Sequence, residues 1–286
     1  MELKMNYKIQ GEWLNLTLDC HLYLDDLFNA LCINKKTRYL LRTEHKIQIG
    51  HEYITTNPLL KKGSTIRLKV IEKTKPDFIS QNLFPLNVVY EDSLILIVNK
   101  PKGYLVHPDK KDGLGTLYNV VSHYYHMHKI QRPIRAIHRL DKQTSGLVLF
   151  CKIPFLQPYF DNALSKKEIK RYYRAEVEGI IHEDFLDINQ PIGKDRHEKN
   201  KYCISSTGKS ALTHCQVVER KQQTTIVDLE LETGRTHQIR VHLKSINHPI
   251  VGDELYGTKA DEMKLHAYAL SFIHPFTKER IQVETA

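Results

Sequence analysis

Segments of strand length dominate the C-terminal part of this sequence. Two continuous apolar runs, residues 94–99 (LILIVN) and 146–152 (GLVLFCK), have the length and composition of buried strands. Residues 171–179, 210–220 and 224–233 instead alternate apolar and polar side chains, as strands with one buried face do. Because few helical segments interrupt these strands, we predict an α+β fold with a largely antiparallel mixed sheet flanked by helices.

Helical spacing in this part is confined to two segments. Residues 155–167 and 236–246 repeat apolar side chains every three or four positions. Thr236 is expected to cap the second helix, because a threonine hydroxyl accepts hydrogen bonds from amides of the first helical turn.

The N-terminal part predicts a separate small module. Residues 24–31 place apolar side chains at i, i+3, i+4 and i+7, and Asn34 precedes a second helical segment that is rich in lysine and arginine. Residues 45–57 and 64–73 then alternate as strands do. These features predict a small α+β module with a basic second helix.

A segment with two prolines and no periodicity follows this module. We therefore divide the chain into the small module at residues 1–73, a linker at 74–83 and a larger domain at 84–286.

The composition is compatible with an RNA or DNA partner and fits a reducing compartment. The 42 lysines and arginines exceed the 33 acidic residues by nine, and such an excess suits a polyanion. No apolar stretch reaches the roughly 18 residues of a membrane span, and the N-terminus lacks the apolar core of a signal peptide. The five scattered cysteines form no C-x-x-C pair, so we expect neither a zinc ribbon nor disulfides, and a cytoplasmic location.

Common cofactor motifs are incomplete. Residues 208–210 (GKS) end like a phosphate-binding loop, but Cys203 stands where its first glycine belongs. Residues 113–115 (GLG) lack the third glycine of a dinucleotide fingerprint, and the histidines of 123–128 have no carboxylate or cysteine at metal-ligand spacing. We therefore expect no metal site and no nucleotide cofactor.

Residues 138–150 (HRLDKQTSGLVLF) place one aspartate among cations at the start of a strand. Asp141 could cap the backbone amides of residues 144–146 in an Asx turn. Alternatively, Arg139 and Lys142 keep its carboxylate ionised, so that it acts as a nucleophile or an electrostatic stabiliser.

Two further clusters could serve the same chemistry. Residues 231–242 (LETGRTHQIRVH) put Arg235 and Arg240 near a predicted helix start, where a phosphate or a catalytic carboxylate would be favoured; the alternative is a solvated basic face. Residues 171–173 (RYY) lie in an alternating strand, where a tyrosine either packs in the core or stacks on a base.

Six segments in this order resemble the signatures of the RluA-type family of pseudouridine synthases. The resemblance covers about residues 84–286, and its signatures are residues 99–108 (NKPKGYLVHP), 138–150, 171–179, 231–243, 248–257 (HPIVGDELYG) and 265–275 (LHAYALSFIHP).

The resemblance implies a role for individual residues. Asp141 matches the essential catalytic aspartate, Tyr173 the family tyrosine, and Arg240 the arginine that pairs with the aspartate. Tyr173 is selected over Tyr172 because an alanine and a glycine follow it at the family spacing. The resemblance also implies these substrate-binding residues: Arg139, Thr144, Arg235, His237 and Ile239. Arg139 would displace the target base from the RNA stack.

The N-terminal module resembles, more weakly, an RNA-binding module shared with a small-subunit ribosomal protein. The helix pair and the strands that follow it support this likeness. The family's Asn-Gly turn between strands is replaced by residues 50–53 (GHEY).

The family reaction is the isomerisation of uridine in RNA. The C1′–N1 bond breaks, the uracil reorients and C5 joins C1′, with no change in redox state and no cofactor. Asp141 would either attack C1′ or remove a ribose proton, and Tyr173 would stack on the base and assist proton transfer. We expect a monomer that acts on 23S ribosomal RNA rather than transfer RNA, because this module is common in the ribosomal enzymes. The alternatives are a non-catalytic RNA-binding protein of ribosome assembly and an N-glycosidase that releases uracil.

Overall fold

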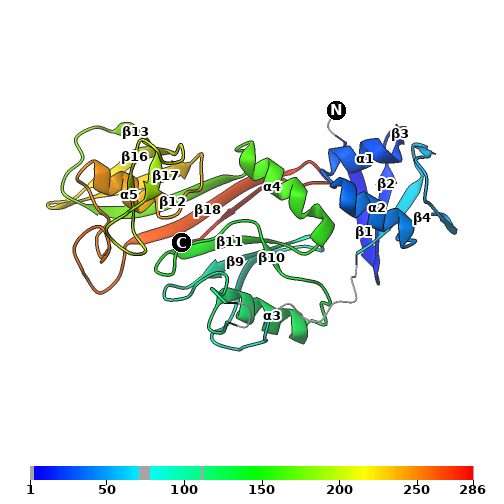
Figure 1. The fold of residues 1–286 in the computed structure, drawn as a ribbon, viewed down its shortest axis with the longest axis horizontal. Coiled ribbons are helices and arrows are strands. Elements are labelled where there is room, and N and C mark those ends of the chain that lie inside the picture. Colours follow the sequence, from blue (N-terminus) through cyan, green and yellow to red (C-terminus); the bar gives the residue numbers. More distant parts are fainter. Residues whose placement is uncertain (1–2, 71–77, 111–112, 286) are drawn as a thin grey trace.

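The computed structural model describes residues 3–70, 78–110 and 113–285, which form a small N-terminal lobe and a larger lobe (Figure 1). The small lobe contains β1 (Met5–Gln10), β2 (Trp13–Leu18), β3 (Leu22–Tyr23), α1 (Leu24–Ala30), α2 (Lys35–Thr43), β4 (Ile47–Ile49), β5 (Glu52–Tyr53), β6 (Leu59–Leu60) and β7 (Thr65–Lys69). Its antiparallel sheet has the order β1-β2-β7-β4-β5, and β3 pairs with β6.

Both predicted helices of the small lobe are confirmed. Helix α1 buries Leu24, Leu27 and Phe28, and Asn34 caps α2 by accepting a 2.9 Å hydrogen bond from the Thr37 amide. Strands β1 and β2 were not predicted, although β2 alternates half-buried and buried side chains along its whole length.

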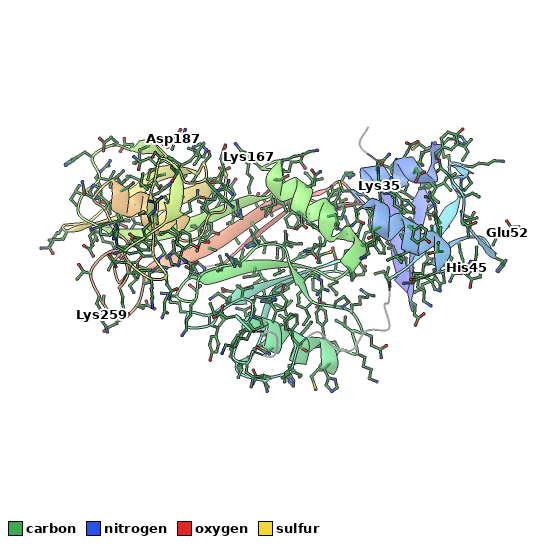
Figure 2. All side chains as sticks on the ribbon, in the orientation of Figure 1. Lys35, His45, Glu52, Lys167, Asp187 and Lys259 are labelled. Carbon is green, nitrogen blue, oxygen red and sulfur yellow. The ribbon has the colours of Figure 1, made fainter. Side chains whose placement is uncertain are left out.

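The basic face expected on α2 is only partly available to solvent. Lys35 projects from the lobe, as Figure 2 shows. Arg38 instead donates to the Ile33 carbonyl at 2.6 Å, and Arg42 donates to the Asp25 carboxylate at 2.7 Å. These two arginines therefore stabilise the lobe internally.

The larger lobe is built on one long sheet. Its elements are β8 (Asn87–Glu91), β9 (Ile95–Lys100), α3 (Leu117–Met127), β10 (Arg135–Ala136), β11 (Ser145–Cys151), a 3-10 turn (Pro154–Leu156), α4 (Gln157–Ser165), β12 (Lys170–Glu178), β13 (Phe185–Asn189), β14 (Ile192–Lys194), β15 (Tyr202–Ile204), β16 (Leu212–Arg220), β17 (Thr224–Leu231), α5 (Gln238–Ser245), β18 (Leu265–Ile273) and β19 (Arg280–Glu284). The sheet order is β13-β16-β17-β12-β18-β11-β9-β8, with β10 beside β11 and β19 beside β18. Among its described strands only β11 and β18 pair in parallel, so the α+β prediction with a largely antiparallel mixed sheet is confirmed.

Both faces of this sheet are covered at its centre, which explains the continuous apolar runs. In β9, Ile95 and Ile97 pack into one hydrophobic cluster while Leu96 and Val98 pack into another. Helix α4 contributes to the first cluster and α3 and α5 to the second. A strand that is buried on both sides needs apolar residues at every position, not at alternate ones. No helix in the described ranges is long and apolar enough to cross a membrane.

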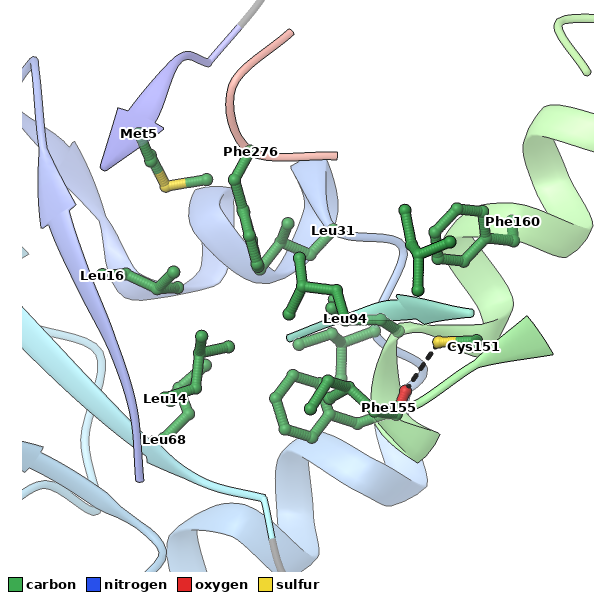
Figure 3. Packing of buried hydrophobic residues seen from close by; sticks show 14 of the residues in the cluster. Met5, Leu14, Leu16, Leu31, Leu68, Leu94, Cys151, Phe155, Phe160 and Phe276 are labelled. Carbon is green, nitrogen blue, oxygen red and sulfur yellow. Dashed lines mark hydrogen bonds between the residues drawn. The ribbon is translucent and has the colours of Figure 1, made fainter. Parts of the chain in front are cut away.

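The two lobes share a hydrophobic core. Met5 and Leu31 of the small lobe belong to the same buried cluster as Leu94 and Phe276 of the larger lobe (Figure 3). The Met5 amide also donates to the Phe276 carbonyl at 2.9 Å. Of the proposed linker at residues 74–83, positions 74–77 lie outside the residues that the structure describes.

Candidate active site

One cleft brings the predicted site residues together. It has a volume of about 720 Å³ and is lined by the turn before β11, by β12 and by the segment that leads into α5. All eight residues that we predicted for the site line it: Asp141, Tyr173, Arg240, Arg139, Thr144, Arg235, His237 and Ile239.

The turn that carries Asp141 is closed by the backbone. The Thr144 amide donates to the Asp141 carbonyl oxygen at 3.2 Å. In the described part of the chain no backbone amide bonds to the Asp141 carboxylate, so the Asx-turn interpretation is wrong. The Asp141 side chain is 27% exposed and lines the cleft.

Lys100, which was not predicted as a site residue, stabilises this turn through hydrogen bonds. Its fully buried ammonium group donates to the carbonyl oxygens of Pro101 and Tyr104, both at 2.9 Å, and of Lys142 at 3.3 Å. Burial lowers the pKa of Lys100 to about 8, against the opposing effect of the Asp141 charge. Lys142 therefore contributes to the site through its backbone carbonyl.

Arg240 joins Asp141 to a second carboxylate. Its Nη1 donates to Asp141 Oδ2 at 3.2 Å, which is the pairing that the resemblance implied. Its Nε and Nη2 each donate to one oxygen of Asp253 at 2.7 Å. Burial on its own lowers the pKa of Arg240, but the bonds to Asp253 and the charges of both carboxylates raise it overall.

His237 also approaches Asp141. Its Nε2 lies 3.9 Å from Asp141 Oδ2, and its Nδ1 lies 2.9 Å from the Tyr256 hydroxyl, which accepts a 2.9 Å bond from the Tyr202 amide. If the Tyr256 hydroxyl donates to Nδ1, the remaining imidazole proton is on Nε2 and points toward Asp141. Burial lowers the pKa of His237, and the Asp141 charge opposes this shift.

The start of α5 differs from the prediction. The helix begins at Gln238, and the preceding His237 is left-handed with φ 56°, so the expected Thr236 cap is wrong. The Gln238 side chain instead closes the turn, accepting from the Thr233 hydroxyl at 2.7 Å and from the Arg235 amide at 3.0 Å. A left-handed non-glycine residue costs backbone energy and persists only where its surroundings fix it. The turn thereby directs the His237 ring at the cleft.

Strand β12 presents Tyr173 to the cleft and Tyr172 to the opposite face. Tyr173 is 5% exposed, and its hydroxyl has no hydrogen-bond partner in the described residues. Burial raises the pKa of Tyr173, Arg171 opposes this and Asp141 reinforces it, so the side chain is a neutral phenol at neutral pH. Tyr172 lies near Tyr268, with 6.5 Å between ring centroids.

Two arginines lie at the rim of the cleft. Arg139 is exposed and only distantly bonded, with 3.5 Å from its Nη2 to the Thr236 hydroxyl. Arg235 donates its Nε to the Ser210 carbonyl at 2.9 Å. Thr144 and Ile239 are buried in the wall. The cleft thus combines a carboxylate at its floor with cations at its edge.

No metal-binding group of three or more His, Cys, Asp or Glu side chains occurs in the described ranges. The histidines of residues 123–128 have other contacts: His123 Nδ1 lies 3.2 Å from the Ser80 hydroxyl, and His128 Nδ1 lies 2.9 Å from the Tyr124 carbonyl.

Sequence reasoning missed Lys100, Asp253 and Tyr256. All three occur in the signature segments 99–108 and 248–257, but none of them was assigned a role from the sequence. Their contacts with the Lys142 carbonyl, the Arg240 side chain and the His237 ring span 42, 13 and 19 positions, so short-range spacing carried no information about these contacts.

Comparisons with known proteins agree on one family. The family of RNA pseudouridylate synthases matches residues 94–245. YhcT of Bacillus subtilis, an uncharacterised RNA pseudouridine synthase, is 35% identical over 99% of this chain and 92% of its own length. Ribosomal large subunit pseudouridine synthase D of Vibrio parahaemolyticus is 34% identical over 90% of this chain and 83% of that protein. The structure of human RNA pseudouridylate synthase domain containing 1 aligns with a TM-score of 0.59 and 27% identity, over 71% of this chain and 83% of that chain.

Because Lys100 is buried, we predict that the stability difference between the wild type and Lys100→Met depends on pH. Its pKa is about 8 in the folded protein against an ordinary 10.5, so between these values the unfolded chain binds more protons and stability rises with pH. We expect the unfolding free energy of the wild type, relative to Lys100→Met, to increase over this window by up to about 1.4 kcal/mol per pH unit. Urea unfolding of both proteins at several pH values measures the difference, and a flat or falling difference would contradict the assignment.

Proposed function

This chain belongs to the RNA pseudouridylate synthase family, as its resemblance to the RluA-type enzymes indicated, and we propose that it isomerises specific uridines in structured RNA at the cleft around Asp141. The observation that carries the proposal is the environment of Asp141. Its carboxylate faces the cleft and is paired with Arg240 through one oxygen only. It shares the cleft with the Tyr173 hydroxyl, which has no hydrogen-bond partner in the part of the chain that the structure describes. That arrangement holds an anion where a sugar carbon can approach it.

The target uridine must first leave the RNA stack, at a cost of a few kcal/mol. We propose that Arg139 fills the vacated space, because its exposed side chain lines the cleft and, among the described residues, makes only a 3.5 Å bond to the Thr236 hydroxyl. Arg235 at the same rim would contact the RNA backbone.

Asp141 would then act on the sugar. The C1′–N1 bond breaks, the uracil turns, and C5 bonds to C1′ while the C5 proton is lost and N1 gains a proton. Whether the carboxylate attacks C1′ or removes a ribose proton, positive charge develops on the sugar, and a fixed nearby carboxylate stabilises it.

Tyr173 would support the base during this rearrangement. A neutral phenol can stack on uracil and can donate a proton, and the raised pKa of Tyr173 keeps it in that form. The isomerisation balances without an oxidant, a reductant or a nucleotide.

We propose 23S ribosomal RNA as the substrate, in preference to transfer RNA. Support comes from the relatives that are named ribosomal large subunit pseudouridine synthase D. A monomer is sufficient, since the eight proposed site residues come from one chain. The free thiols of all five cysteines suit a cytoplasmic enzyme.

Replacing Asp141 with asparagine tests the catalytic assignment. The substitution preserves size and removes the charge, so we expect Asp141→Asn to lose pseudouridine formation while RNA affinity stays within about threefold of wild type. Product is measured by mass spectrometry of treated RNA, and binding by a filter assay. An active Asn variant would remove Asp141 from the mechanism, whereas wild-type release of free uracil with an abasic site would reveal an N-glycosidase.

The neighbouring tyrosines provide a matched pair. Tyr173→Phe keeps the ring and removes the hydroxyl, so we expect kcat to fall roughly 10²- to 10⁴-fold if that hydroxyl transfers a proton. Tyr172→Phe alters the opposite face of the same strand and should leave kcat unchanged. Equal turnover of the two variants would restrict Tyr173 to stacking.

The RNA target is tested in cells. In a strain that lacks the gene we expect at least one pseudouridine to disappear from large-subunit ribosomal RNA, and to return with the wild-type gene but not with Asp141→Asn. Mapping pseudouridines across ribosomal and transfer RNA measures this. A loss confined to transfer RNA would refute the ribosomal substrate and keep the enzymatic assignment.

A further inference from the structure

We propose that Asp253 is a positioning residue, which holds Arg240 so that it contacts one oxygen of Asp141 and leaves the other oxygen free to react. This inference rests on the proposed function of Asp141. It assigns Oδ1 of Asp141 as the reacting atom.

The contacts of Arg240 divide unequally between the two carboxylates. Asp253 takes the edge formed by Nε and Nη2 through two bonds of 2.7 Å, whereas Asp141 receives one bond of 3.2 Å from Nη1. Bidentate charge-assisted bonds fix the guanidinium plane as well as its position. Asp253 therefore determines where Arg240 lies, and Asp141 receives only the N–H that remains directed toward it.

Asp253 is itself held rigidly. Its side chain is fully buried, and its Oδ1 also accepts from the amides of Leu255 at 3.0 Å and Tyr256 at 3.3 Å. The Asp253 amide donates to the Ile250 carbonyl at 3.1 Å. A buried carboxylate with these backbone bonds has no room to follow a moving arginine.

The result for Asp141 is an asymmetric carboxylate. Arg240 and His237 both approach Oδ2, at 3.2 and 3.9 Å, and Oδ1 has no partner among the described residues. If Asp253 did not occupy the edge of Arg240, the guanidinium could turn and bind both oxygens of Asp141, as arginine and carboxylate commonly do. Both lone-pair sites would then be engaged, and the carboxylate would be a poorer nucleophile or base.

Asp253→Asn is the informative substitution. Asparagine keeps a carbonyl oxygen for the amides of Leu255 and Tyr256, but it removes the charge and places the NH2 group of its side-chain amide against one donor of Arg240. We expect kcat to fall roughly 10- to 100-fold while KM for RNA changes less than about threefold. A single-turnover experiment should show the same fall in the rate constant of the chemical step.

Asp184→Asn is the matched control. Asp184 pairs with Arg220 at 2.6 Å, is 72% exposed and does not line the cleft. We expect its kcat to equal that of the wild type. A wild-type kcat in Asp253→Asn as well would overturn the proposal.

A double substitution separates positioning from simple charge compensation. Arg240→Met leaves Asp253 as a buried unpaired charge, so adding Asp253→Asn should raise the melting temperature again. If Asp253 acts through Arg240, the double variant keeps the kcat of Arg240→Met. If kcat of the double variant is instead lower than that of Arg240→Met by the factor that Asp253→Asn alone causes, Asp253 acts independently of Arg240 and the proposal is refuted.

The Asp141→Asn protein distinguishes this failure from a failure of the proposed function. An inactive Asp141→Asn with a fully active Asp253→Asn removes only the positioning role. An active Asp141→Asn removes the catalytic assignment on which that role depends.

Discussion

The ionic contact among Asp141, Arg240 and Asp253 is the constraint on which the cleft depends. Arg240 and Asp253 are nearly or fully buried, and buried charges are stable only when they are paired and hydrogen-bonded. Pairing them requires the turn before β11, helix α5 and the segment before β18 to meet at one point. The site and the tertiary structure are therefore specified by the same contacts.

The central sheet makes this meeting possible. The start of β11, just after the Asp141 turn, pairs in parallel with β18 at Gly146 and Ala267. A Cβ at position 146 would collide with the Ala267 backbone, and Gly146 has φ +119°, so only glycine allows the strands to approach there. Lys100, at the end of β9, then ties the turn to the other side of β11 through carbonyl oxygens. Asp141 is fixed by backbone geometry on both sides, which leaves its carboxylate free for the cleft.

Most of the sheet and the residues that meet in the candidate site could be predicted from the sequence. The apolar runs at β9 and β11 and the alternation in β12 and β17 follow directly from which faces are buried. The resemblance supplied Asp141, Tyr173 and Arg240. It did not supply Asp253, because a pairing between positions 240 and 253 depends on how α5 and the following loop pack. The Thr236 cap failed for a related reason: the left-handed His237 directly precedes α5, and the Gln238 side chain closes the preceding turn through bonds to Thr233 and Arg235, which no local pattern encodes.

Tertiary contacts also determine how much of the positive charge of the chain is available to a partner. A net charge of +9 suits an RNA partner, but the count treats every cation as available. Arg38 and Arg42 bond within the small lobe, Arg240 and Lys100 are buried beneath Asp141, and Arg220 is paired with Asp184. The attraction to RNA depends on the cations that remain exposed, such as Lys35 and Arg139. Arg139 lines the cleft, so in the proposed reaction its charge would act where a flipped uridine enters.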